Sequence, residues 1–156
     1  MEAIAALQAS AFGAWARGSA YAYPLANLIH LLGLLLLVGG VGVLDIRLAG
    51  LWRNLPVAAL SRALTPLAIA GLVLMLPSGF TMFAADAKTL AASPLFLWKL
   101  ALIGLAVINA VAFRLAWGKR LDRWGHAVPP GARAMAIASL SLWLVVGALG
   151  RLIAYA

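Results

Sequence analysis

One histidine, His30, lies inside an apolar run that is long enough to cross a membrane, "YPLANLIHLLGLLLLVGGVGVLDIR", from Tyr23 to Arg47. Ionisable side chains at such a depth are expensive and often functional. An imidazole there can act as an axial ligand of haem iron. The alternative is a structural histidine that bonds to a hydroxyl or carbonyl group of a facing helix.

Four other residues belong to the same candidate site, because helical geometry places them near the level of His30, roughly 13 Å into the membrane from its outer side. They are Gly33, Met75, Lys99 and Arg151. In a haem site, His30 ligates the metal, and Gly33 leaves room for the macrocycle. The second iron ligand comes from Met75 or a second subunit, or that position stays open. Lys99 and Arg151 hold the propionates. The electropositive level also suits a quinone head or another anion.

Each of these residues also has a structural interpretation. Lys99 and Arg151 are close enough to the interface to extend their charges into it, as long basic side chains near helix ends commonly do. Met75 is of a type that fills irregular gaps in a core. The second histidine, His126, lies in the polar stretch "GKRLDRWGHAVPPGAR" and cannot share a ligand with His30. A bis-histidine site therefore needs two copies of the chain or a partner subunit.

The elements that position these residues are transmembrane helices, since 65% of the chain is hydrophobic and only 10% is charged. About 30 Å of hydrocarbon requires roughly 20 residues at a rise of 1.5 Å. The runs extend approximately from Pro24 to Leu44, Leu64 to Ala85, Pro94 to Trp117 and Ala134 to Ile153. We expect an all-α integral membrane four-helix bundle, a single domain over residues 1–156, with residues 1–20 forming a short helix on the outer surface.

Basic residues collect in the first and third connections between the runs, which predicts that these connections are cytoplasmic and that both termini are periplasmic. We therefore read the net charge of +8 as a topology signal, with the lipid bilayer and no nucleic acid as partner. Asp45 and Arg47, with Arg114, are expected to form an ion-pair anchor at the inner boundary. The chain has no cysteine and no carboxylate pair, activated serine or metal-ligand cluster at one depth. We do not expect catalysis by the isolated chain.

Three stretches together resemble a bacterial inner-membrane family of four-helix proteins that is known only as a domain of unknown function. They are "YPLANLIHLLGLLLLVGGVGVLDIRLAGL", "SPLFLWKLALIGLAVINAVAF" and "SLSLWLVVGALGRLIAY", which extend over Tyr23 to Tyr155. The resemblance implies a multi-pass protein of the bacterial inner membrane. The family pattern commonly has an acidic residue where Asn27 stands and often a histidine where Arg114 stands, and both departures weaken a metal or haem site taken from it. A looser, fold-level resemblance is to CopD-type copper-resistance proteins and four-helix b-type cytochromes.

Two functions of different class follow. The bundle is either a cofactor-binding redox module, with b-type haem or a quinone in the outer half of the membrane, or an accessory or assembly subunit. In the accessory-subunit alternative, the polar residues join helices of the bundle, and the outer surface binds a partner. The chain is then part of a homo-oligomer or a larger membrane complex. A transporter is a third alternative, but it lacks the mid-membrane carboxylates that usually couple ions.

Overall fold

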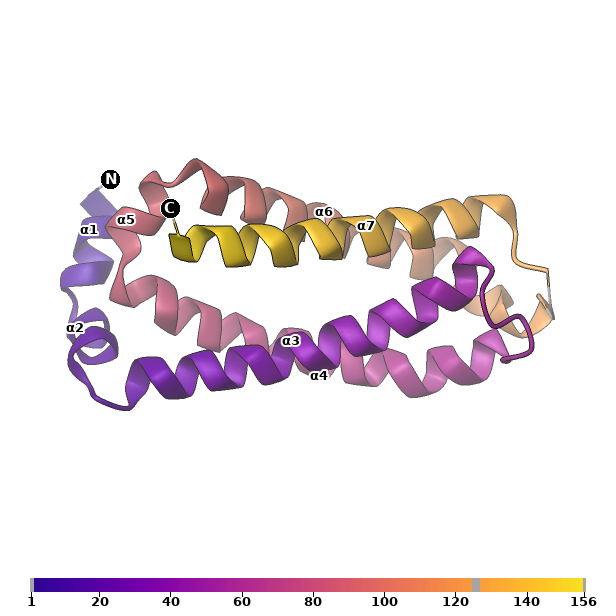
Figure 1. Cartoon of the computed structure of the whole chain (residues 1–156), viewed down its shortest axis with the longest axis horizontal. Helices are drawn as coiled ribbons and strands as arrows, with labels where there is room; N and C mark the ends of the chain where they lie inside the picture. The colour runs from indigo at the N-terminus through magenta and orange to yellow at the C-terminus, as the bar shows by residue number, and fades with distance from the viewer. Residues whose placement is uncertain (1, 125–126, 156) are drawn as a thin grey trace.

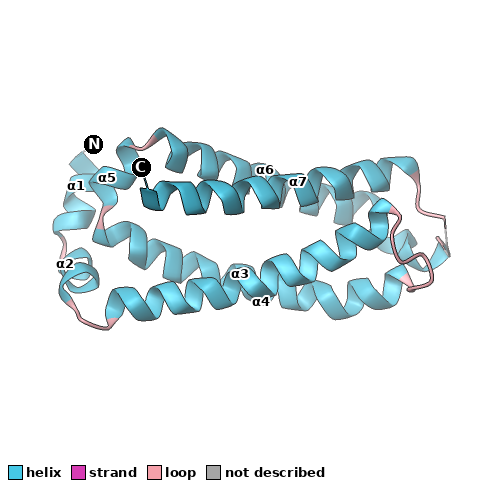
Figure 2. Cartoon of the chain, in the orientation of Figure 1, coloured by secondary structure: helices cyan, strands magenta, loops and turns pink. Residues whose placement is uncertain are grey.

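The computed structural model describes residues 2–124 and 127–155, and all regular structure within these ranges is helical (Figure 2). Four helices are long and apolar enough to cross a membrane. They are α3 (Ala22–Ala49), α4 (Val57–Ala85), α6 (Pro94–Trp117) and α7 (Pro130–Leu152). This confirms the predicted all-α fold with four spans, and the chain is a multi-pass membrane protein.

The helices extend further than the apolar runs at the end where α3 joins α4. Helix α3 continues five residues beyond the predicted Leu44, and α4 begins at Val57 instead of Leu64. Hydropathy detects only the part of a helix that lies in hydrocarbon, whereas arginine is a good helix former and continues the helix into the headgroup region. Helix α6 has the predicted bounds, and α7 begins at Pro130 because proline suits the first helical turn.

The two ends of the bundle are built differently (Figure 1). One end, here called the cap end, carries α1 (Glu2–Ala9), α2 (Ala11–Gly18), α5 (Ala87–Ala92) and the short 3-10 helix η2 (Ile153–Tyr155). The other, the loop end, carries the α3–α4 connection and the 3-10 helix η1 (Gly118–Arg123), which follows α6. His30 belongs to the cap half, since it lies eight residues after the start of α3.

The N-terminal segment is two helices instead of the single one predicted. Ser10 separates α1 from α2 and caps α2, because its Oγ accepts a hydrogen bond from the Gly13 backbone N–H at 3.1 Å. Helix α2 is fixed to α4, since Arg17 Nη1 donates to the Ala85 carbonyl at 3.0 Å. The segment therefore covers the cap end of α4 and α5.

Glycines allow α3 and α4 to approach backbone to backbone. A Cβ atom at Gly71 would lie 2.5 Å from the carbonyl oxygen of Gly33 and 2.5 Å from the Leu37 nitrogen, and one at Gly40 would lie 2.8 Å from the Leu64 oxygen. Small residues serve this purpose in membranes, where lipid is as apolar as the helices and association depends on close packing. This α3–α4 interface is the most extensive in the chain, and α6–α7 and α3–α7 contacts join the second helix pair to it.

Large buried side chains fill the loop end and the middle of the bundle but not the cap half. The loop-end cluster includes Leu48, Trp124 and Val128, and the middle cluster includes Leu37 and Trp143. Apart from Val146 of the middle cluster, the buried apolar side chains in the described part of the cap half are alanines: Ala16, Ala22, Ala26, Ala84, Ala85 and Ala87. Figure 1 shows α3 diverging from α7 toward this end.

The outward faces of the four long helices are apolar and in contact with lipid. Their exposed large side chains include Leu35, Leu76, Ile108, Leu115 and Leu144. Contiguous apolar faces of this size do not occur on soluble monomers. The expected partner, the lipid bilayer, is therefore supported by the fold.

Arg47 organises the loop end. It is fully buried, and it donates from Nε to the Leu55 carbonyl at 2.7 Å and from Nη2 to the Arg53 carbonyl at 2.9 Å. Carbonyl groups that leave the helical ladder near lipid need such donors. The arginine therefore holds the α3–α4 connection against the end of its own helix.

The predicted ion-pair anchor of Asp45, Arg47 and Arg114 was wrong for the part of the chain that the structure describes. Asp45 lies beside the Ser139 side chain of α7, and Arg114 donates to Thr65 Oγ1 of α4 at 2.5 Å. Hydroxyl and carbonyl groups of neighbouring helices were available to both residues, so neither needed an opposite charge.

We expect Gly71→Ala to destabilise the bundle. Alanine is normally about 0.5–1 kcal/mol better than glycine inside a helix, but here the added carbon must separate two backbones, and overpacking costs roughly 1–3 kcal/mol. Thermal unfolding in mild detergent should show a lower midpoint. The control is Gly39→Ala, where an added Cβ meets nothing within 4 Å, and its midpoint should be unchanged or higher. Equal midpoints for the two variants would contradict close packing at Gly71.

Candidate functional site

His30 of α3 is hydrogen-bonded to α4. Its Nδ1 lies 3.1 Å from Oγ of Ser78, a buried residue whose hydroxyl donates to the Leu74 carbonyl at 2.6 Å. A hydroxyl has one hydrogen. Because Leu74 takes it, Ser78 Oγ is left to accept, so the network assigns the proton of the neutral ring to Nδ1 and the lone pair to Nε2.

The imidazole ring lies against the backbone of Gly79. A Cβ atom there would be 3.1 Å from Cε1 and 3.4 Å from Nδ1 of His30, so any larger residue would displace the ring. Metal-ligating histidines usually have the second ring nitrogen bonded, which fixes ring orientation. Ser78 and Gly79 together provide that restraint. Sequence reasoning did not identify either as a neighbour of His30, although Gly71 and Ser78 are seven residues apart and share one helix face.

Gly33 and Met75 meet directly below His30. A Cβ atom at Gly33 would lie 2.7 Å from Met75 Cγ and 2.7 Å from the Gly71 carbonyl oxygen. The space beside Gly33 is therefore occupied by α4. Met75 is half-buried and packs against the middle core cluster. The structure thus brings His30, Gly33 and Met75 together within the α3–α4 interface.

Lys99 enters the site from α6. It is half-buried, and its positive charge is near enough to act on the His30 ring. The side chain lies against α7, where a Cβ atom at Gly150 would be 3.3 Å from Nζ. Among the described residues, no side chain or carbonyl group forms a hydrogen bond or ion pair with this ammonium group. A half-buried ammonium group without a protein acceptor leaves room for an acceptor group or anion beside it.

Arg151 is directed elsewhere. It is exposed, donates from Nη2 to the Tyr155 hydroxyl, and lies over the Tyr155 ring with its guanidinium carbon 4.7 Å from the centroid. Its charge is thus engaged at the end of its own helix. The two cations that were expected to act together therefore have different environments.

Aromatic side chains close the cap end above the site. Phe83 of α4 stacks on Phe96 of α6 with centroids 5.5 Å apart, and Phe12 of α2 stacks on Phe80 of α4 at 5.9 Å. Lys99 follows Phe96 by one helical turn. These ring pairs join α4 to α6 and to α2 at the cap end.

A metal site built from several protein ligands is not present in the described residues, which contain no group of three or more His, Cys, Asp or Glu side chains that could hold a metal ion. Haem iron has a different requirement, because the macrocycle supplies four ligands and the protein one or two. Residue His126, the other histidine, lies outside the described residues.

Comparisons with known proteins gave no match: no family model, no curated protein and no solved structure matches the chain. The resemblances to the family of unknown function, to CopD-type proteins and to b-type cytochromes stay predictions. The function is therefore argued from the residues of this site alone.

We expect His30 and Ser78 to be energetically coupled. A double-mutant cycle of His30→Leu and Ser78→Ala, followed by unfolding in mixed detergent micelles, should give a coupling of about 0.6 kcal/mol, as is typical of a hydrogen bond between membrane helices. Ser141→Ala is the control, since Ser141 is exposed on α7 and should not couple to His30. Additive effects of the His30 and Ser78 substitutions would show that the bond contributes nothing.

Proposed function

We propose that the chain is a cofactor-binding redox module, which holds a b-type haem or a quinone head in the cap half of the membrane. The observation that carries this proposal is the restraint on His30: Nδ1 lies 3.1 Å from Ser78 Oγ, and the Ser78–Leu74 bond leaves the lone pair of the neutral ring on Nε2. Metal-ligating histidines usually have the second ring nitrogen held in this way. The small buried side chains of the cap half give further support.

For a haem, Nε2 of His30 is the axial ligand, and Lys99 binds a propionate. Met75 or a His30 from a second copy of the chain is the candidate for the opposite axial position. The bound group supplies one-electron chemistry, and the protein sets its orientation and electrostatics. Arg151 contributes to propionate binding only after release from Tyr155, so Lys99 is the stronger anion partner.

For a quinone, the same two residues have different roles. The Lys99 ammonium group donates to a carbonyl oxygen of the ring, and Nε2 of His30 accepts the proton of a quinol hydroxyl. A quinone whose apolar tail lies in the bilayer could place its head at the depth of His30. An optical spectrum distinguishes this alternative from haem.

The second candidate is a non-catalytic accessory or assembly subunit, and it too has a specific observation in its favour. The His30–Ser78 bond joins α3 to α4, so the histidine has a structural role without any ligand. In this alternative, Phe12 and Trp15 on α2 are exposed contacts for a partner at the cap end.

We also propose that the loop end is cytoplasmic and the cap end periplasmic, in the inner membrane of a bacterium. Eight of the twelve Lys and Arg residues support this orientation, since they lie at or near the loop end: Arg47, Arg53, Arg62, Arg114, Lys119, Arg120, Arg123 and Arg133. Basic residues near membrane boundaries favour the cytoplasmic side.

Under the redox proposal, His30→Ala should abolish the Soret band of protein made in cells supplied with a haem precursor. The substitution removes the side chain that would ligate the iron. It leaves a cavity no larger than one imidazole, so the variant should stay folded. Absorption spectra of protein in mild detergent, oxidised and then reduced with dithionite, measure the effect. Quinone extraction and chromatography of the same samples test the other cofactor.

Lys99→Gln and Arg151→Gln refine this test. Loss of a charge-assisted hydrogen bond costs roughly 1.5–3 kcal/mol, which lowers cofactor affinity about tenfold or more. We expect that loss for Lys99→Gln and a smaller one for Arg151→Gln. Wild-type protein that contains neither haem nor quinone would replace the redox proposal with the accessory-subunit alternative.

The orientation predicts that Ala92→Cys labels with an impermeant maleimide from the periplasm of intact cells, whereas Asn54→Cys labels only after the cells are opened. Both positions are exposed, at opposite ends of the bundle, and the chain has no cysteine of its own. Ser10 and Ser93 are unsuitable because they cap helices. Labelling of Asn54→Cys in intact cells would reverse the orientation.

A further inference from the structure

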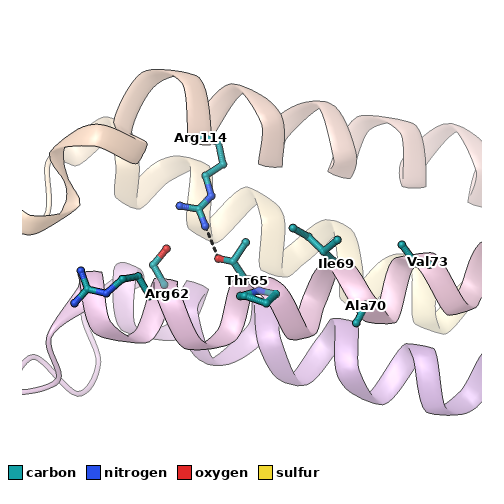
Figure 3. A pocket seen from close by; sticks show the side chains of 8 residues that line it. Arg62, Thr65, Ile69, Ala70, Val73 and Arg114 are labelled. Carbon is teal, nitrogen blue, oxygen red and sulfur yellow. Dashed lines mark hydrogen bonds between the residues drawn. The ribbon is translucent and has the colours of Figure 1, made fainter.

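A groove runs along the loop-end half of α4 where this helix faces α6 (Figure 3). Its volume is about 460 Å³. It exists because α3 packs on α4 and on α7, and α6 packs on α7, while α4 and α6 make little direct contact over their described residues. The groove lies on the opposite half of the membrane from His30.

The groove is polar at one end and apolar along the rest. Arg62, Thr65 and Arg114 form the polar end together with Ser61. Toward the middle of the membrane, the lining changes to Pro66, Ile69, Ala70 and Val73. The twelve residues from Arg62 to Val73 span about 16 Å of helix, close to half of the roughly 30 Å hydrocarbon thickness. The groove therefore matches one leaflet in depth.

The charges at the polar end are positive and only partly neutralised. Arg62 Nη1 pairs with Asp122 Oδ1 at 3.3 Å, with both side chains exposed. Arg114 Nη2 donates to Thr65 Oγ1 at 2.5 Å, and no described carboxylate pairs with Arg114. A guanidinium group has five donors in a planar fork that suits phosphate. Figure 3 shows the Arg114 side chain crossing from α6 toward Thr65 above the groove.

Ser61 adds a second, independent feature. It is 1% exposed and lines the groove, and its Oγ has no hydrogen-bond partner among the described residues. Buried hydroxyl groups without a partner are uncommon.

We propose that the groove binds one anionic phospholipid from the leaflet at the loop end, with its phosphate on Arg114 and Arg62 and one acyl chain along Ile69 and Val73. Basic pockets between transmembrane helices commonly recognise such headgroups. A helix from a second copy, about 10 Å wide over the same 16 Å, needs more than twice the groove volume. Inorganic phosphate would leave the apolar part of the groove without a ligand. This site is independent of the redox proposal.

The test titrates the full chain in mild detergent with phosphatidylglycerol, with phosphatidylcholine of the same acyl chains, and with glycerol 3-phosphate, and reads the bound mass by native mass spectrometry. We expect one phosphatidylglycerol to bind about tenfold more tightly than phosphatidylcholine, and glycerol 3-phosphate not to compete. Arg114→Gln should weaken phosphatidylglycerol binding about tenfold. Val73→Trp, which fills the apolar part, should weaken binding of both lipids.

Arg120→Gln is the matched control, because Arg120 is exposed at the same end but does not line the groove. Its phosphatidylglycerol affinity should equal that of the wild type. Equal losses in Arg120→Gln and Arg114→Gln would mean diffuse attraction and would overturn the proposal. Equal affinity for the two lipids, or competition from glycerol 3-phosphate, would also overturn it. So would a native mass spectrum in which the protein is a dimer of this chain that binds no lipid.

Discussion

The close approach of α3 and α4 is the constraint on which the rest of the structure depends. In lipid no hydrophobic force draws apolar helices together, so the pair is held by packing through Gly33, Gly40 and Gly71. With the backbones this close, the His30 ring reaches Ser78 and has only Gly79 to lie against. The separation of two helices thus determines the orientation of His30.

A second constraint is that polar groups in lipid need hydrogen-bond partners inside the protein. The polar side chains of this chain have different kinds of partner. Arg47 bonds to the carbonyl groups of its own loop, Asp45 lies beside a hydroxyl on α7, and Arg114 bonds to a hydroxyl on α4. The Arg114 bond joins two helices, α6 and α4, that otherwise make little direct contact over their described residues. Lys99 lacks such a bond to the described residues, and this contrast is why we propose that it contacts a bound anion or acceptor group.

The fold was accessible from the sequence because apolar length alone identifies a membrane span. The level of His30, Met75 and Lys99 was accessible too, since depth follows from counting residues along a helix. What counting does not give is rotation about the helix axis. It therefore did not show that Arg151 engages Tyr155, that Gly33 is covered by Met75, or that α4 and α6 separate beside Arg114. Ser10 breaks the N-terminal segment through a side-chain cap, which hydropathy does not detect.

The contacts of the N-terminal helices have a consequence for the order of synthesis. Gln8 accepts from the backbone of Lys88, and Arg17 donates to Ala85, so these helices bind segments made 80 and 68 residues later. At about 5–20 residues per second, the ribosome needs roughly 4–16 s to produce 80 residues. During that interval α1 and α2 lack their contacts with α4 and α5. They become a lid only after α4 and α5 have emerged, which makes closure of the cap end a late step in assembly.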